Sequence, residues 1–258
     1  MNQNNFDWCC TNKELVIYVP NYGRKYLLIP TLKRFKTNIP NEKWMWLIAN
    51  DGIHEDMSDL ESDNLKWFTF ERQPNQERNG CMIRNFVIKN CQSKWLCTKD
   101  PEITIEGDIV SKILSIENDI VYRPKGMVEL YEQNTQQIID DPFIDLTQLP
   151  ILRQWEASDK RNQAFHAGCA IRTQRLKDMQ GYDERYKEGY GYEDWQMLER
   201  LKKTVPVLID ENIQTYHVGH PIIRKFHKTI INNEGIYNSD LRNLSIVANE
   251  GKEWGNGV

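Results

Sequence analysis

Short apolar runs alternate with segments of helical spacing along the first hundred residues of the chain. Residues 15–19 form a β-branched run that ends at a Pro-Asn turn signal, and the next segment, 25–35, places Leu28, Leu32 and Phe35 on one helical face. The alternation continues with strands predicted at 43–49, 65–70 and 93–98 and a helix at 79–90. Strands that alternate with helices indicate an α/β fold, in which a mostly parallel, Rossmann-like sheet carries helices on both faces.

The second half of the chain is less regular. Its pattern predicts helices at 109–117, 175–179 and 193–203, an apolar run at 165–172, and strands at 120–124, 205–209 and 215–218. Residues 132–159 have no clear period and are rich in Gln, Asp and Pro, which predicts a long surface excursion. We therefore expect one domain over 1–221, followed by a basic, helical C-terminal tail over 222–258.

The composition is that of a globular protein, because 40% of the 258 residues are hydrophobic and 27% are charged. With 33 Lys and Arg against 37 Asp and Glu, the net charge is −4, which argues against binding nucleic acid through phosphate contacts alone. No apolar run approaches the roughly 18 to 20 residues of a membrane span, and the polar N-terminus is unlike a signal peptide. We expect a cytoplasmic protein without a transmembrane segment.

The six cysteines contain no C-x-x-C pair, so we expect reduced thiols rather than a disulfide framework. A zinc site made from Cys81, Cys91 and Cys97 is the alternative, but their spacing matches no structural zinc template.

Polar residues follow the predicted strands at the edge of the sheet where ligands bind in open α/β folds. Pro20-Asn21 ends the first strand, Asn50-Asp51 follows the second, and Arg84 lies in the helix that precedes the fourth. No G-x-G-x-x-G motif or P-loop accompanies them. Side chains rather than a glycine-rich loop must therefore contact any phosphate group.

Asp100 and Glu102 are separated by one proline at the end of a buried strand. Carboxylate oxygens placed in this way suit Mg²⁺ or Mn²⁺ that holds a diphosphate. His217 and His220 follow another predicted strand, and either could supply an imidazole to the same ion. The structural alternatives are an ordinary Asp-Pro turn and two surface or packing histidines.

A second cluster of carboxylates begins a helix near the end of the domain. Glu193 and Asp194 follow a Gly- and Tyr-rich segment, and a helix N-terminus favours negative charge, so simple capping is one interpretation. In the other, one carboxylate is a general base in a pocket walled by Tyr190, Tyr192 and Trp195, whose flat faces suit a sugar ring.

Seven short motifs, taken together and in order, resemble those of a known enzyme family. They are Pro20-Asn21, Asp51-Gly52, Arg84-Asn85, Asp100-Pro101-Glu102, Gly168-Cys169-Ala170-Ile171-Arg172, Gly181-Tyr182-Asp183-Glu184 and Gly191-Tyr192-Glu193-Asp194. This order is similar to that of nucleotide-sugar glycosyltransferases with the GT-A fold, especially the large family 2 and the group with the galactosyltransferase-type C-terminal motif. The resemblance implies a nucleotide-binding half over about 13–108 and an acceptor-binding half over about 109–221.

The resemblance also implies roles for the residues that bind the donor. Pro20, Asn21 and Arg24 would line the uridine pocket, Asp51 would hold the base, and Arg84 would approach the nucleotide or diphosphate.

For the metal, the resemblance places Asp100 and Glu102 at the family's D-x-D position, although the second acid is Glu and proline stands between them. His217 or His220 would add a third ligand to Mn²⁺ or Mg²⁺.

For catalysis, the resemblance makes Asp194 the base and Glu193 the acid that contacts the acceptor. The acceptor site would include Gly168 together with Tyr190, Tyr192 and Trp195.

The sequence therefore predicts a glycosyltransferase that moves a sugar from a nucleoside diphosphate sugar, expected to be a UDP-sugar, to a glycan or other hydroxyl acceptor with inversion. A sugar- or nucleotide-binding module without catalysis is one alternative. The other is a phage- or virus-type enzyme that glycosylates modified DNA bases through a basic surface. That surface would consist of Arg153, Lys160, Arg161, Arg172, Arg175 and Lys177.

Overall fold

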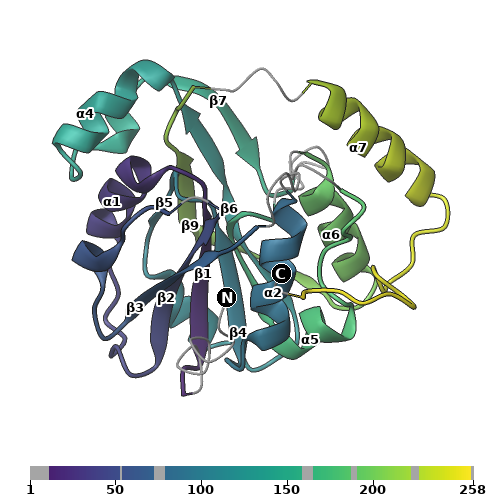
Figure 1. The fold of residues 1–258 in the computed structure, drawn as a ribbon. Helices are drawn as coiled ribbons and strands as arrows, with labels where there is room; N and C mark the ends of the chain where they lie inside the picture. The colour runs from purple at the N-terminus through teal and green to yellow at the C-terminus, as the bar shows by residue number, and fades with distance from the viewer. Residues whose placement is uncertain are drawn as a thin grey trace.

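A computed structural model describes residues 12–52, 54–72, 79–158, 165–186, 191–221 and 227–256, with the side chains of 227–229 left aside. A nine-stranded sheet runs through the described chain in the order β3-β2-β1-β4-β8-β6-β9-β5, and β7 pairs with β6 (Figure 1). Its strands are β1 (Leu15–Asn21), β2 (Trp44–Asp51), β3 (Leu65–Phe70), β4 (Trp95–Lys99), β5 (Ile103–Glu106), β6 (Val121–Leu130), β7 (Ile151–Glu156), β8 (Ala167–Arg172) and β9 (Val207–His217).

The first four strands form the parallel part of this sheet, with β2 and β4 on either side of β1 and β3 outside β2. From β4 onward the pairing is mainly antiparallel, in β4-β8, β8-β6, β6-β7 and β9-β5, while β6-β9 is parallel. The predicted α/β class is confirmed. Parallel pairing is nevertheless concentrated in the first half, because few helical crossovers of the kind that parallel neighbours need join the later strands.

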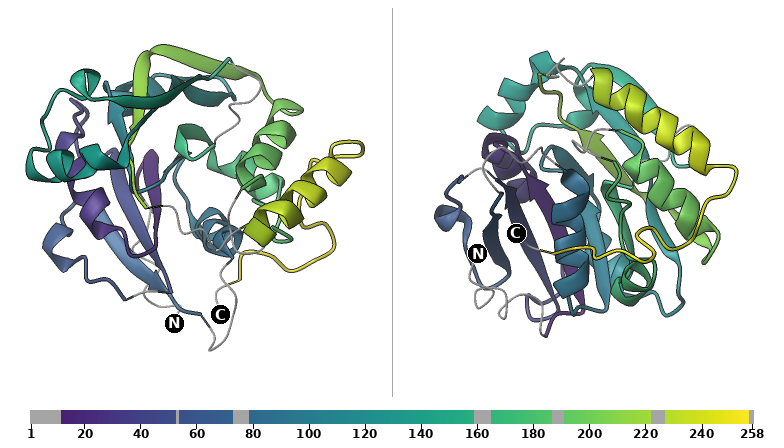
Figure 2. Two further views of the ribbon diagram at one scale, coloured as in Figure 1. Left: turned by 90° about the horizontal axis from the view of Figure 1, so that it is seen from above. Right: turned by 45° about the vertical axis from the view of Figure 1, so that its right-hand side comes forward.

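Helices cover both faces of the sheet, as predicted (Figure 2). They are α1 (Lys25–Arg34), α2 (Gly80–Asn90), α3 (Ile109–Leu114), α4 (Thr135–Asp140), α5 (Thr173–Asp178), α6 (Glu193–Lys202) and α7 (His227–Asp240). Apolar side chains of α2, α5 and α6 pack with Val16 and Tyr18 on one face, and those of α1 and α3 pack with Leu15 and Ile17 on the other.

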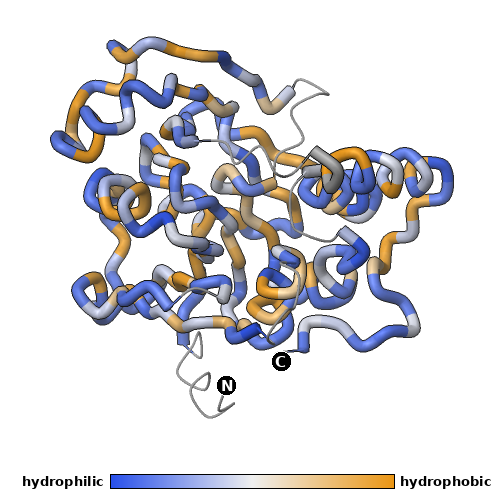
Figure 3. The backbone as a smooth tube through the Cα atoms, turned by 45° about the horizontal axis from the view of Figure 1, so that its top comes forward, coloured by the Kyte–Doolittle hydropathy of each residue, from blue (hydrophilic) through white to orange (hydrophobic). Residues whose placement is uncertain are grey.

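Strands that are buried on both faces are apolar throughout, which is why β1 and β2 appear in the sequence as continuous hydrophobic runs. The outer helices instead alternate hydrophobic and hydrophilic segments (Figure 3). Among the described residues, no helix combines the length and the apolar character that a membrane crossing requires.

The predicted surface excursion at 132–159 is wrong in part. It contains the short helix α4, 3₁₀ turns at Glu132–Asn134 and Leu146–Gln148, and the strand β7, which returns antiparallel to β6. Two turns of helix and one exposed edge strand carry too little periodicity to be recognised in the sequence. Two predicted strands, 205–209 and 215–218, are one strand, β9, whose polar middle resembles a turn. The four-residue β5 was not predicted.

The four described cysteines, Cys81, Cys91, Cys97 and Cys169, are buried and no disulfide joins them, as expected for reduced thiols. Cys9 and Cys10 lie outside the described residues. Cys81 and Cys91 belong to one hydrophobic cluster and Cys97 to the cluster on the other face of the sheet, so the zinc alternative fails for these three residues.

The C-terminal segment packs on the domain. Helix α7 lies beside α6, and residues 241–256 then return toward α2 (Figures 1 and 2). Asn249 donates from its side-chain amide to the carbonyls of Gln180 and Tyr182, and the backbone N–H of Gly255 donates to Glu184. The boundary at residue 222 remains a prediction, but the segment that follows helps to hold the domain.

Asn85 of α2 fixes the Gly181-Glu184 motif to the core. Its amide donates to the Tyr182 carbonyl at 2.8 Å and to Glu184, and its oxygen accepts from the Tyr182 N–H at 2.6 Å. Gly181 has φ +64, and a β-carbon there would lie 2.1 Å from the Asn85 oxygen. A residue with a side chain would therefore break this anchor.

Two Gly→Ala substitutions test this anchor. We expect Gly181→Ala to lower the free energy of unfolding by about 2–4 kcal/mol, because it combines a left-handed backbone with a clash against Asn85. Gly235→Ala, in α7 with open space around the added carbon, is the matched control and should raise it by about 0.5–1 kcal/mol. Both are measured by chemical denaturation, and equal effects at the two positions would contradict the proposed anchor.

Candidate active site

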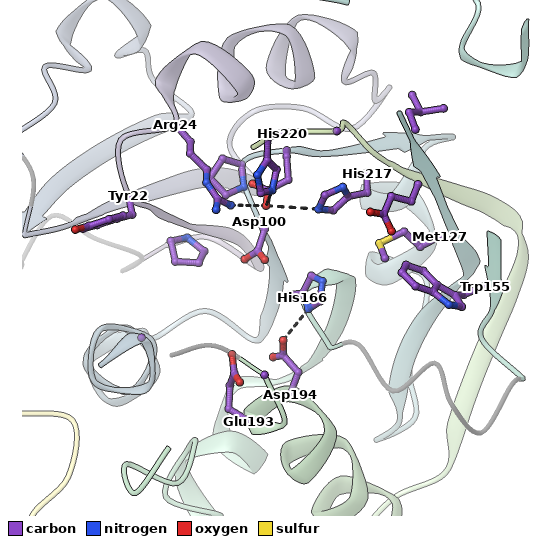
Figure 4. Close-up of a pocket in the computed structure, with 18 of the residues that line it drawn as sticks. Tyr22, Arg24, Asp100, Met127, Trp155, His166, Glu193, Asp194, His217 and His220 are labelled. Atoms are coloured by element: carbon purple, nitrogen blue, oxygen red, sulfur yellow. Dashed lines mark hydrogen bonds and ion pairs between the residues drawn. The ribbon is translucent and has the colours of Figure 1, made fainter. Parts of the chain in front are cut away.

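A cavity of about 730 Å³ opens beyond the carboxyl ends of β1, β2 and β4. Most of the residues that the sequence singled out line it. These are Pro20, Arg24, Asp51, Arg84, Asp100, Glu102, Tyr192, Glu193, Asp194, Trp195, His217 and His220. Figure 4 draws 18 of the lining residues and labels ten of them, among them His217, His220 and the Glu193-Asp194 pair.

Three predicted site residues are not placed in this cavity. Asn21 is buried, donates to Asn50 and Glu55, and accepts from the Arg24 N–H, so it fixes the turn into α1 rather than facing a ligand. Gly168 packs inside the core, where an added β-carbon would lie 3.3 Å from Ile105. Tyr190 lies outside the described residues.

One end of the cavity carries an aromatic ring and a buried acid. Asp51 is buried and paired with Arg72, whose Nε donates to it at 3.0 Å. The Arg72 guanidinium also lies 5.7 Å from the centre of the Tyr22 ring. Arg72 and Tyr22 had not been assigned from the sequence, because their relation to Asp51 depends on the parallel pairing of β2 and β3.

At the centre, a carboxylate meets two imidazoles. The Nε2 atoms of His220 and His217 lie 3.1 Å and 3.7 Å from Glu102 Oε1, and Arg24 donates to the same oxygen at 2.5 Å. Antiparallel pairing sets Ile103 of β5 opposite His217 of β9, which brings the three side chains together (Figure 4).

The charge states of this group follow from burial and neighbours. Burial alone would raise the pKa of Glu102, but the hydrogen bond from His220 and the charge of Arg24 outweigh it, and the pKa falls well below its usual range. Burial lowers the pKa of His217 to about 4 against the attraction of Glu102. At neutral pH, Glu102 is ionised and His217 is a neutral imidazole.

These three side chains fit a divalent cation. Their donor atoms all lie within 4.8 Å of one another. Among the described residues, they are the one set of three or more His, Cys, Asp or Glu side chains close enough to share a metal ion. Glu102 Oε2 is buried without a hydrogen-bond partner in the described chain. One oxygen and two nitrogen donors suit Mn²⁺ better than Mg²⁺, which prefers oxygen ligands alone. Asp100, predicted as a ligand, is not in this group.

Asp100 instead faces the second cluster. Its Oδ1 lies 3.6 Å from an Arg84 nitrogen, and its backbone N–H donates to the His166 carbonyl at 3.0 Å. Burial raises the pKa of Asp100 in spite of the favourable charge of His166. Asp100 therefore joins the two clusters rather than completing the first.

In the second cluster, Asp194 is held by His166. Asp194 Oδ2 and His166 Nδ1 form a hydrogen bond of 2.7 Å, and the Tyr182 hydroxyl donates to the other oxygen at 3.3 Å (Figure 4). Glu193 lies 3.6 Å from Arg84, and its Oε2 is buried without a partner among the described residues. The residue that precedes the helix, Tyr192, has φ 70 and makes no side-chain cap.

The two neighbouring acids have opposite pKa shifts. Burial would raise the pKa of Asp194, but the charge and hydrogen bond of His166 lower it below its ordinary value. Burial and the charge of Asp194 raise the pKa of Glu193 to about 7. Although burial disfavours its charge, His166 has its pKa raised to about 9 by Asp100 and Asp194. At neutral pH, Asp194 is ionised opposite a histidine cation.

His166 was missed because it is a single histidine before an apolar strand, with no motif around it. Its role is visible only once β8 pairs antiparallel with β4, which sets it beside the end of β4. Tyr192 and Trp195 do line the cavity, but their rings also pack on each other at 5.3 Å and on Tyr237 of α7. Part of their surface is therefore used in packing.

The architecture around this site is the GT-A fold. A solved structure of S. aureus TarS 1–349 in complex with UDP-GlcNAc superposes with a TM-score of 0.57 at 16% identity, over 81% of this chain and 59% of that chain. The mannosyltransferase PcManGT from Pyrobaculum calidifontis, in complex with GDP-Man and Mn²⁺, gives 0.53 at 11% identity, over 84% and 60%.

The catalytic domain of Drosophila β1,4-galactosyltransferase 7, in complex with xylobiose, gives a TM-score of 0.52 at 14% identity, over 88% of this chain and 79% of that one. The sequence matches no protein-family model and no curated protein. At these identities the likeness defines the fold, which confirms the GT-A architecture that the sequence motifs resembled.

The raised pKa of Glu193 predicts a pH-dependent stability. In the folded protein, Glu193 keeps its proton up to about pH 7, whereas in the unfolded chain it loses the proton near its ordinary pKa of 4.5. The free energy of unfolding that this proton contributes is therefore complete below pH 4.5 and is lost as the pH rises through about 7. Because glutamine does not titrate, Glu193→Gln should not lose this stability as the pH rises. The stability of the variant relative to the wild type should rise by up to about 3 kcal/mol between pH 5 and pH 8.

Urea denaturation at several pH values measures this difference. Glu211→Gln, at a side chain that is 70% exposed, is the control for the substitution itself. A Glu193→Gln difference that stays constant from pH 5 to pH 8 would show that Glu193 is ionised across this range.

Proposed function

We propose that this protein is a glycosyltransferase that moves a sugar from a nucleoside diphosphate sugar to an acceptor hydroxyl, with inversion at the anomeric carbon. One observation carries the proposal: an ionised Asp194, anchored by His166, shares a cavity with the Glu102-His217-His220 group. Solved neighbours of the same fold hold UDP-GlcNAc, UDP and GDP-Man, which supports a nucleotide-sugar donor.

The donor would lie across the first half of the chain, over about 13–108. Pro20, Tyr22 and Asp51 border the end of the cavity that suits a nucleoside, and we expect uridine there. Arg24 and Arg84 are arginines that lie beside the carboxylate clusters and line the cavity, so they would approach the diphosphate. The half over about 109–221 would hold the acceptor.

Glu102, His217 and His220 would hold a divalent cation, with Mn²⁺ favoured over Mg²⁺ by their nitrogen donors. Such an ion, when bound, supplies positive charge that stabilises the departing diphosphate. A mannosyltransferase neighbour was solved with Mn²⁺, which is consistent with this use of the site.

Asp194 would act as the base. Its carboxylate is ionised, and the hydrogen bond from His166 leaves its other oxygen toward Tyr182 and the cavity. A base that removes the acceptor proton on the face opposite the leaving group gives in-line attack and inversion. Glu193, adjacent and less acidic, would contact an acceptor hydroxyl.

The two alternatives make different demands. A binding module without catalysis would bind nucleotide without hydrolysing or transferring the sugar. The DNA-modifying alternative needs free basic residues, yet Arg153 pairs with Glu129 and Arg175 pairs with Asp119. Arg172 donates to the backbone carbonyls of Ile116 and Glu117, which follow α3. Lys160 and Arg161 lie outside the described residues. Three of the six basic residues are thus engaged within the protein, which favours a glycan or other hydroxyl acceptor. A cytoplasmic site of action remains our expectation.

Asp194→Asn tests the base. Transfer should fall by roughly 10²- to 10⁴-fold, because the amide cannot take the proton, while UDP affinity changes little. The His166 cation loses its partner, so its pKa should fall, which NMR titration of the imidazole can follow. Asp178→Asn, at an acid outside the cavity, is the matched control. Near-normal transfer by folded Asp194→Asn would rule out Asp194 as the base.

Mn²⁺ binding tests the carboxylate-imidazole group without relying on activity. Calorimetry in the presence of UDP should give an affinity that falls at least about 10-fold in Glu102→Gln and His217→Ala. The affinity should also fall as the pH is lowered, since His220, whose pKa is raised by its hydrogen bond to Glu102 in spite of burial, must lose its proton to bind. His54→Gln, at an exposed histidine, is the control. Unchanged Mn²⁺ affinity in both variants would place the ion elsewhere.

A further inference from the structure

One wall of the cavity has no part in the donor, metal or base assignments. It is formed by the antiparallel pair β6-β7, whose register sets Met127 opposite Trp155 and Glu129 opposite Arg153. In Figure 4, Met127 and Trp155 lie on the opposite side of His217 from Tyr22. This hairpin wall, comprising Met127, Glu129, Arg153 and Trp155, therefore faces the nucleoside end across the cavity.

Local packing holds the hairpin wall in place. A β-carbon at Gly126 would lie 2.1 Å from the Trp155 carbonyl, so glycine is required for β7 to approach β6 this closely. On its other side, β6 sets Glu129 opposite His217 of β9. The wall is therefore directly adjacent to the carboxylate-imidazole group.

The chemistry of the hairpin wall is that of a sugar-binding surface. Arg153 Nε donates to Glu129 at 2.5 Å, and the guanidinium lies 4.4 Å from the centre of the Trp155 ring. The Arg153 side chain is 55% exposed, whereas that of Glu129 is 11% exposed. A flat stacked surface beside a carboxylate acceptor and guanidinium donors can contact both the apolar face and the hydroxyls of a pyranose ring.

The charge of the hairpin wall distinguishes a neutral acceptor from an anionic one. The cation of Arg153 is balanced by Glu129, and the carboxylate of Glu132 also borders the cavity nearby. An acceptor phosphate or carboxylate would be repelled by this net negative charge, because the hairpin wall has no unpaired cation among its described side chains to offset it. A neutral ring meets no such penalty.

We propose that the hairpin wall is the acceptor subsite and that it takes a neutral saccharide ring, stacked on the Trp155-Arg153 surface and hydrogen-bonded to Glu129. The proposal rests on the proposed glycosyl transfer and adds the class of acceptor. It also relocates the acceptor from the Tyr192-Trp195 region, part of whose surface packs against Tyr237 of α7, to the β6-β7 hairpin.

The test uses the full chain with UDP and Mn²⁺ and a panel of neutral methyl and p-nitrophenyl glycosides as probes. Binding is followed by saturation-transfer NMR, and donor hydrolysis is measured in parallel. At least one glycoside should bind the wild type, and its affinity should fall about 10-fold in Trp155→Leu, while Trp155→Phe stays within about 3-fold. UDP affinity and donor hydrolysis should be unchanged within about 2-fold.

Trp67→Leu, on the edge strand β3 and outside the cavity, is the matched control for loss of a tryptophan. Because Trp155 also packs against the core, Glu129→Gln and Arg153→Gln provide a second test if Trp155→Leu does not fold. Each of these variants should bind the same glycoside more weakly. For Glu129→Gln, the loss of affinity should not be accompanied by a matching fall in the melting temperature.

The subsite is overturned if no neutral glycoside binds the wild type, or if binding is equal in wild type and folded hairpin variants. It is also overturned if only anionic probes bind, such as a glycerol phosphate oligomer or an oligonucleotide containing hydroxymethylcytosine. Failure of the subsite leaves donor hydrolysis intact. Failure of the proposed function shows instead as no hydrolysis or transfer of any nucleotide sugar, with glycoside binding that still depends on Trp155.

Discussion

The site depends on holding four carboxylates together in one cavity. Asp100, Glu102, Glu193 and Asp194 all line it, and each would repel the others if the positive side chains between them were absent. Arg24 lies against the first cluster and His166 against Asp194, while Arg84 lies within 4 Å of both Asp100 and Glu193. Arg84 is buried, stays a cation, and lies between acids from two separate segments. The positive charges of the site are therefore already engaged by the protein's own acids, and the diphosphate of the proposed donor would have to compete with these acids for them. This competition favours a bound cation that adds charge.

The position of Arg84 is itself set by contacts outside the cavity. Its guanidinium lies 5.3 Å from the centre of the Tyr182 ring, and Tyr182 is fixed at both its backbone N–H and its carbonyl by Asn85, one residue along α2. The same carbonyl accepts from Asn249 in the C-terminal segment. One helix thus presents Arg84 to the acids and clamps the loop that supplies the hydroxyl for Asp194. The Gly181-Glu184 motif is consequently a structural element that holds this loop beside the site.

The parts that could be predicted are those whose pattern is local. Strands such as β1 and β2 are buried on both faces and appear as apolar runs, and Asp100, Glu102, Glu193 and Asp194 stand out as acid pairs beside a turn or a helix start. The parts that could not be predicted depend on pairing between distant segments. His166 lies beside Asp194 because β8 pairs with β4. The pairing of β5 with β9 brings both His217 and His220 to Glu102, whereas the sequence suggested one or the other. Asn21 was predicted to contact the ligand because it ends a strand, yet its side-chain amide donates its hydrogen bonds to Asn50 and Glu55. The sequence pattern identifies which residues end a strand but not which way each side chain turns.

The adjacent acids at the start of α6 show why neighbouring residues of like type need not share a role. Helical geometry points successive side chains about 100° apart, so Asp194 turns toward His166 and Glu193 toward Arg84. His166 lies at 2.7 Å and stabilises the charge on Asp194, whereas Arg84 lies at 3.6 Å from Glu193 and only partly offsets its burial. Repulsion between the two acids widens the difference, because whichever is ionised raises the pKa of the other. The result at neutral pH is one carboxylate able to accept a proton and a neighbour that can hold a proton and donate a hydrogen bond. In the proposed transfer, this difference would let Glu193 orient an acceptor hydroxyl while Asp194 accepts its proton.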